Sequence, residues 1–161
     1  MILPGHIAVA IFCHRLLRLD LSTLIAAALL PDAVDKGLAH VLRVTPSGRY
    51  AMHSLPGWLF SSLAVGLWGG EKRRHAWAVG HLAHLLGDPG QVPWWFPFKQ
   101  YEFPEAMSLS QFLTAAFGTA EAQRSLALET LLLILALLCP RAYPIARRHE
   151  ACGYRVGSGK G

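Results

Sequence analysis

Negative charge is scarce in this chain of 161 residues. Only ten residues are acidic, and Lys, Arg, Asp and Glu together make up 16% of the sequence, leaving a net charge of +5. The mean hydropathy of +0.33 is high for a soluble protein. Three of the few aspartates, Asp32, Asp35 and Asp88, lie in segments that also contain or adjoin histidine or proline motifs. The length is sufficient for one domain with a real hydrophobic core.

Sequence signals for a disulfide framework, a secretory leader and a nucleotide-binding loop are also missing. The three cysteines, Cys13, Cys139 and Cys152, are widely spaced, which excludes a zinc-finger spacing and a disulfide framework and favours free thiols in a reducing compartment. The N-terminus has no basic region and no cleavage site, so we expect no signal peptide. The glycine-rich tail over 151–161 is no P-loop and is expected to be flexible, which leaves 1–150 as a single helical domain.

Positive charge gathers in two places, residues 72–74 and residues 141–148. Such clusters can face anionic lipid headgroups, or they can be solvated loops beside apolar helices. No interleaving of aromatic and basic residues supports a nucleic-acid partner, so we do not expect one. The sequence does not indicate an oligomeric state.

Strand-like alternation is absent, and apolar helical patterns fill most of the chain. We expect an all-α fold, a compact bundle of about five to six apolar helices with a metal site in its core. The expected helices are 5–18, 21–31 ending at Pro31, about 46–68 with a kink or break at Pro56 and an end at Gly69-Gly70, 72–87, 109–117 opened by a Ser108–Gln111 capping box, and 120–139 ending at Pro140. The prolines within 89–104 predict an aromatic loop there.

Long hydrophobic runs are absent as well. The most apolar stretch, residues 126–139, is short and includes Glu129, which suits a buried or re-entrant helix better than a span. Nearly every helix is nevertheless apolar, and Trp68, Trp77, Trp94 and Trp95 could sit at a lipid interface. We therefore expect association with a membrane, either integral or peripheral.

A histidine and an aspartate mark the segment Gly80-His81-Leu82-Ala83-His84-Leu85-Leu86-Gly87-Asp88. On a helix, His84 and Asp88 stack on one face, with His81 on the same side. An unpaired carboxylate is costly in such an apolar stretch, so Asp88 needs a partner, and a cation is a good one.

Other segments offer further ligands: His6, the pair Asp32 and Asp35, and His53. Imidazole with carboxylate suits zinc first, and also manganese or iron. Each residue also has a simpler interpretation. Asp32 can cap a helix, His53 can be a satisfied core histidine, and the helical pair can be a plain hydrogen bond.

These segments in their order resemble the membrane-bound metal-dependent hydrolases, which are distantly similar to zinc-dependent phospholipase C. The matching stretches are Gly5-His6, 29–36, 46–54, 80–88 and 93–98. The resemblance implies a helical bundle whose metal ligands are His6, Asp32, His53, His84 and Asp88, with Asp35 as the second acid of a Pro-Asp motif. No later His-x-x-x-Glu pair is present, so we expect one or two divalent ions rather than three.

The function that follows is hydrolysis of a phosphoester, soluble or lipid, at the inner membrane by a metal-activated water. Asp35 could be a ligand or a general base, and His81 could orient a ligand, contact substrate or only support the site. Lys36 and Arg49 could bind phosphate or be solvated charges. The aromatic loop over 94–98 could hold an acyl chain, lie at the bilayer surface or simply pack.

Two alternatives use the same residues. A non-catalytic membrane protein could hold a structural metal or a buried His/Asp network, and a closed, fully ligated site would favour it. A metal transporter with intramembrane His and Asp is the other, and the short helices argue against it.

Overall fold

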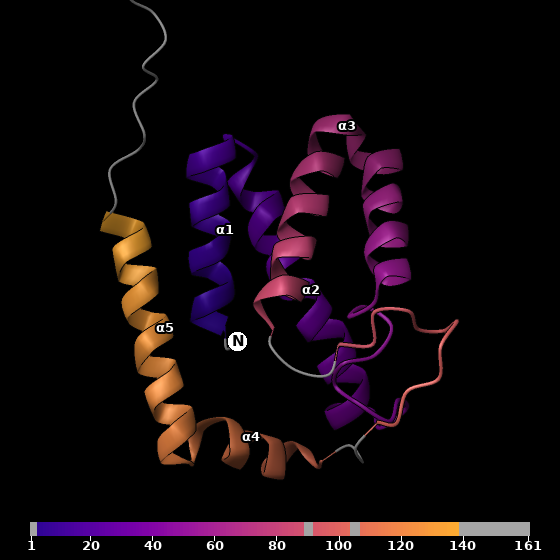
Figure 1. The fold of residues 1–161 in the computed structure, drawn as a ribbon, viewed down its shortest axis with the longest axis vertical. Coiled ribbons are helices and arrows are strands. Elements are labelled where there is room, and N and C mark those ends of the chain that lie inside the picture. Colours follow the sequence, from indigo (N-terminus) through magenta and orange to yellow (C-terminus); the bar gives the residue numbers. More distant parts are fainter. Residues whose placement is uncertain (1–2, 89–91, 104–106, 139–161) are drawn as a thin grey trace, which may run out of the picture.

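The computed structural model describes residues 3–88, 92–103 and 107–138, and these residues form helices and loops without a β-strand (Figure 1). The helices are α1 (Leu3–Leu17), α2 (Leu21–Lys36), the π-helical turn η1 (Gly37–Val41), α3 (Leu55–Gly87), α4 (Leu109–Phe117) and α5 (Ala120–Leu138). The predicted all-α class is confirmed. The predicted helix end at Pro140 and the predicted tail over 151–161 lie outside the described residues.

Helix α2 continues through Pro31, so the predicted end at that residue is wrong. An internal proline costs a helix about 3 kcal/mol, but Pro31 is almost fully buried, and packing of α2 against α1 and α3 outweighs that cost. As a result Asp32, Asp35 and Lys36 lie within the last turn or so of one helix rather than in a loop.

Helix α3 consists of two arms that meet at Gly70, where φ is 79° and ψ is 175°. Figure 1 shows the arms side by side and antiparallel. The predicted break near Gly69-Gly70 is confirmed, and glycine suits it because this φ is unfavourable for other residues. The predicted start near residue 46 is wrong. The helix begins at Leu55 with Ser54 as N-cap, and Pro56 lies in the first turn, where its missing N–H causes no kink.

Small residues bring α1, α2 and the second arm of α3 together. The core between them contains Ala10, Leu24, Ala28 and Ala76. At Gly80 the second arm of α3 comes close to α2, because a Cβ atom there would lie 2.9 Å from the Leu24 carbonyl oxygen. This contact places the following turns of α3, which include His81 and His84, directly against α2.

Helices α4 and α5 form the outer part of the molecule. The predicted Ser108–Gln111 capping box opens α4 and is confirmed. Helix α5 runs alongside α1 (Figure 1), and its Glu129 is buried and accepts a hydrogen bond from the Gly5 backbone N–H at 3.2 Å. Most other side chains of both helices are exposed.

The described part of the predicted aromatic loop, residues 92–103, has no helix. Its Phe96 and Phe103 pack against Tyr50, with ring centroids 4.5 and 5.3 Å away, whereas Trp95 and Phe98 are exposed. Within the described ranges, no helix combines the length and apolarity needed to cross a membrane.

Candidate metal centre

All five side chains predicted as metal ligands meet at one place in the structure. His6 comes from α1, Asp32 from α2, His53 from the residue before the N-cap of α3, and His84 and Asp88 from the end of α3. Each of the five has less than a tenth of its surface exposed. One ligand atom from each of His6, Asp32 and His84 lies within 4.8 Å of the others, a spacing that can hold a metal ion.

His53 lies between the other groups. Its Nε2 atom is 3.1 Å from Nε2 of His84, 3.3 Å from Oδ1 of Asp32 and 3.9 Å from Oδ2 of Asp88. On the other side, Nε2 of His6 is 3.7 Å from Oδ2 of Asp32, and the His6 ring stacks on His84 at 4.1 Å between centroids. The five groups therefore form one contiguous buried cluster.

Hydrogen bonds at Nδ1 set the tautomers of two of these histidines. Nδ1 of His53 is 2.8 Å from the Asp35 carboxylate, and Nδ1 of His84 is 2.7 Å from the Ala28 carbonyl oxygen. Both partners can only accept, so each Nδ1 carries a hydrogen. In the neutral rings the two Nε2 lone pairs then face each other across 3.1 Å, which is favourable only if a proton or a metal ion lies there.

Two further atoms of the cluster lack hydrogen bonds. Among the described residues, Nε2 of His6 and Oδ1 of Asp32 are buried without a hydrogen-bond partner. Leaving a buried polar atom unsatisfied costs about 1–3 kcal/mol, so such atoms in a native protein need an explanation. A nitrogen lone pair and a carboxylate oxygen are both donors to zinc, and a bound cation would satisfy them together.

Two basic residues neutralise part of the cluster's charge. Nζ of Lys36 lies 2.6 Å from Asp32, and Arg49 donates two hydrogen bonds to the Asp88 carboxylate at 2.6 and 2.7 Å. Neither is a freely solvated charge. Asp32 and Asp88 therefore each have a basic partner, whereas Asp35 is held by backbone N–H groups.

The pKa values differ across the cluster. Burial, and then the neighbouring His84, lower the pKa of His6 to about 4, and burial also lowers the pKa of His84. Burial acts the same way on His53, but the nearby carboxylates of Asp32 and Asp35 outweigh it and raise that pKa. His6 and His84 are therefore neutral at pH 7, the state that a metal requires, and His53 retains a proton most readily.

Asp35 and His81, predicted as catalytic, lie behind the cluster. The buried Asp35 carboxylate accepts hydrogen bonds from the backbone N–H groups of Tyr50, Met52 and His53. Nε2 of His81 is 2.8 Å from the Met52 carbonyl oxygen, and burial lowers its pKa to about 4. Both residues thus support the segment that carries His53.

Sequence reasoning missed two supports of this arrangement. The Ala28 carbonyl, which fixes His84, belongs to the backbone and leaves no mark in the sequence. Ser61, whose hydroxyl lies 3.0 Å from Nδ1 of His81 and accepts a hydrogen bond from Trp77, sits on the other arm of α3. Only the antiparallel pairing of the arms reveals that contact.

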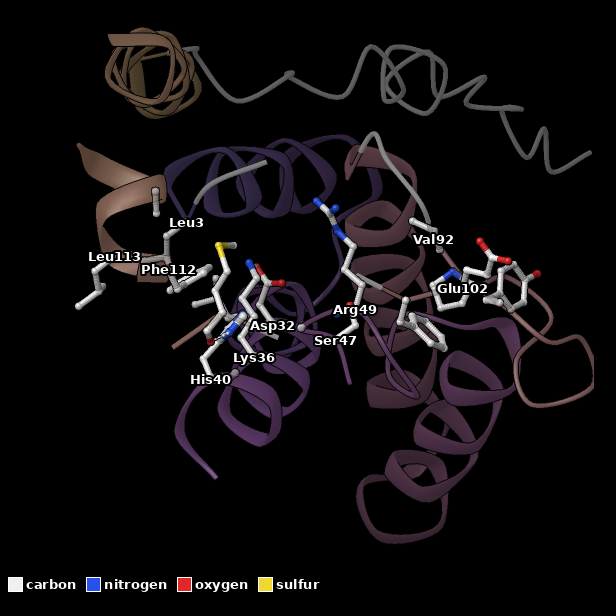
Figure 2. Close-up of a pocket in the computed structure, with 18 of the residues that line it drawn as sticks. Leu3, Asp32, Lys36, His40, Ser47, Arg49, Val92, Glu102, Phe112 and Leu113 are labelled. Atoms are coloured by element: carbon white, nitrogen blue, oxygen red, sulfur yellow. Dashed lines mark hydrogen bonds and ion pairs between the residues drawn. The ribbon is translucent and has the colours of Figure 1, made fainter. Parts of the chain in front are cut away.

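A large cavity adjoins the cluster (Figure 2). Its volume is about 1300 Å³, and Asp32 is the cluster residue in its wall, with Lys36 and Arg49 beside it. Figure 2 shows Asp32 and Lys36 in the middle, and Leu3, Phe112 and Leu113 together at the α4 side. Asp35 and His81 are not among the lining residues.

Comparisons with known proteins give a family but no individual relative. No curated protein and no solved structure matches the chain. The family model described as YdjM inner membrane protein matches residues 1–147, nearly the whole sequence. This match confirms the predicted location at the inner membrane. The chain therefore belongs to the YdjM inner membrane protein family.

Proposed function

We propose that this protein is a metal-dependent hydrolase of the inner membrane that acts on a phosphoester. The observation that carries the proposal is the pair of Nε2 lone pairs, from His53 and His84, that face each other beside the unsatisfied atoms of His6 and Asp32. His6, Asp32 and His84 would hold a divalent cation, zinc first, with His53 and Asp88 completing the site. Manganese or iron would also suit these ligands.

A bound cation would polarise a phosphoryl oxygen and lower the pKa of a water molecule. The chain's own residues would position the substrate beside it. Lys36 and Arg49 line the cavity next to Asp32, where their N–H groups can donate to phosphate oxygens. Asp35 would orient His53 rather than take a proton from water, because its carboxylate is fully buried and already accepts several hydrogen bonds.

A second candidate is a non-catalytic membrane protein in which the same side chains satisfy one another. The ion pairs Lys36–Asp32 and Arg49–Asp88 favour it, because they already neutralise two of the carboxylates. In that protein a proton on His53 would bridge to His84, and no metal would be needed.

Metal content decides between the two. We expect full-length protein purified in mild detergent to contain about one or two equivalents of zinc or manganese by mass spectrometry. His84→Ala should bind the ion more than about 100-fold more weakly, because a ligand contributes more than an outer-shell contact. His75→Ala is the matched control, since His75 is exposed on the same arm of α3 and pairs with Glu71.

Absence of metal from the wild type, even after incubation with these ions, would overturn the metal site. Full retention by His84→Ala would overturn the ligand assignment. If metal is present, hydrolysis of a chromogenic phosphodiester should depend on it and stop when a chelator is added. Metal without any such hydrolysis would favour a structural role.

A further inference from the structure

We propose that the cavity beside the cluster binds a lipid, with its phosphate at Lys36 and Arg49 and its hydrocarbon chain along α4. Such a lipid would be the substrate class of the proposed hydrolase. Its hydrolysis rests on the proposed function, but its binding does not.

The size of the cavity favours a ligand longer than a soluble phosphoester. Its volume of about 1300 Å³ exceeds the roughly 300–1,000 Å³ of most small-molecule sites. The cavity also extends from Asp32 to Phe117 at the end of α4, so its walls come from elements that are far apart in the sequence.

Charge is confined to part of the wall. Lys36, Arg49 and Lys99 bring three cations, against the carboxylates of Asp32 and Glu102. In Figure 2, Asp32 and Lys36 lie between the apolar group at α4 and the side that bears Glu102. Lys36 and Arg49 already pair with Asp32 and Asp88, but each has further N–H groups that can donate to an anionic headgroup. Their position beside the cluster would put a phosphate near the candidate ligands.

The α4 side of the wall is apolar, and within it Phe112 stacks on the His40 ring with centroids 4.5 Å apart. Phe112, Leu113, Ala116 and Phe117 line the cavity there, with Leu3 and Met107 nearby. Helix α4 has no buried residue, and Leu113 and Phe117 are 45% and 48% exposed. A hydrocarbon chain in the cavity would remove this apolar surface from water, at about 25 cal/mol for each Å² covered.

A protein at the inner membrane has phospholipids available as ligands. The protein belongs to an inner membrane family, so phospholipids surround it. A lipid with a single acyl chain and a phosphodiester headgroup matches both parts of the wall. Its anionic phosphate fits the basic residues, and its acyl chain fits the apolar side at α4.

The test is photolabelling with a monoacyl phosphatidylglycerol that carries a photoreactive group at the end of its chain. Full-length protein in detergent is labelled with a chelator present, and the labelled peptides are mapped by mass spectrometry. We expect labelling within residues 109–117. Ala116→Trp should reduce it about fivefold or more by filling the wall. Ala115→Trp is the matched control, because Ala115 is exposed on the same helix and does not line the cavity.

Competition on the wild type makes the test independent of any variant. Unlabelled monoacyl phosphatidylglycerol should compete at least about tenfold better than an uncharged monoacylglycerol of the same chain length. Labelling spread over Leu16 and Leu17 of α1 and the exposed leucines of α5, or equal competition by the uncharged lipid, would overturn the inference. Because the labelling is done without metal, it reports on lipid binding alone. If the metal measurement finds no metal, the hydrolase proposal fails, and labelling at α4 still supports the lipid site.

Discussion

Asp35 organises the residues around His53 through one carboxylate. It accepts hydrogen bonds from three backbone N–H groups and from Nδ1 of His53, and it is completely buried. Hydrogen bonds to an ionised acceptor are roughly twice as strong as neutral ones. This residue therefore fixes both the loop before α3 and the tautomer of the His53 ring.

Replacement of Asp35 by Asn should disturb folding as well as function. The amide offers one acceptor oxygen where the carboxylate offers two, so buried N–H groups lose partners. We expect a loss of about 2–4 kcal/mol in the free energy of unfolding. Chemical denaturation followed by circular dichroism measures it, and metal affinity should fall with it because His53 loses its orientation.

Asp20→Asn is the control, since Asp20 is an exposed N-cap and Asn is an equally good capping residue. Unchanged stability and metal content in Asp35→Asn, with activity alone lost, would instead identify Asp35 as the general base.

Single residues of the site were predictable to different degrees. The spacing of His84 and Asp88 indicates a shared helix face, and the ordered resemblance pointed to His6, Asp32 and His53. The partners of the basic residues were not predictable. Arg49 and Asp88 lie 39 positions apart, and only the folded chain shows that they pair.

Helix boundaries depend on local and tertiary effects that compete. The capping box before α4 is a local signal, and it predicted the start of that helix correctly. Pro31 is a local breaker, yet α2 passes through it because burial outweighs the missing hydrogen bond. The chain between η1 and Leu55 stays irregular because Asp35 binds its backbone N–H groups, which are then not available for a helix.

The crossing of α2 and α3 depends on Gly80. A Cβ atom there would lie 2.9 Å from both the Leu24 carbonyl oxygen and Cβ of Ala27, so Gly80→Ala must push the helices apart. Overpacking costs about 1–3 kcal/mol, against a gain of up to about 1 kcal/mol in helix propensity. We expect a net loss of about 1–2 kcal/mol and weaker metal binding, since His84 moves away from the Ala28 carbonyl.

Gly66→Ala is the matched control for this prediction. Its Cβ would meet only the flexible Arg74 side chain, so it should keep or raise stability. Thermal unfolding in detergent compares the two variants. Equal melting temperatures for both would show that the close approach at Gly80 does not determine the helix crossing.

The whole molecule has an unusual distribution of apolar side chains. Exposed large hydrophobic residues outnumber the buried apolar ones, and the core consists largely of alanine. They occur on every long helix, for example Phe12, Leu67, Trp68 and Leu138. High hydropathy predicted a membrane protein, as the family confirms. The sequence could not show which faces stay exposed, because that depends on which helices pack together.

Apolar contact, rather than charge, should therefore hold the protein at the inner membrane. If the basic cluster over 72–74 were the anchor, high salt would screen it, since the Debye length falls to about 3 Å at 1 M. We expect membranes to retain the protein when they are washed with 1 M salt, which is roughly one hundred times the ionic strength at which screening is weak.

A double variant, Arg73→Glu with Arg74→Glu, should be retained equally, because it changes charge and leaves the apolar faces intact. Release of the wild type by salt would assign the anchor to charge, and release of the double variant at ordinary ionic strength would assign it to the basic cluster over 72–74. Retention in both, with release by detergent, would assign it to the exposed apolar side chains.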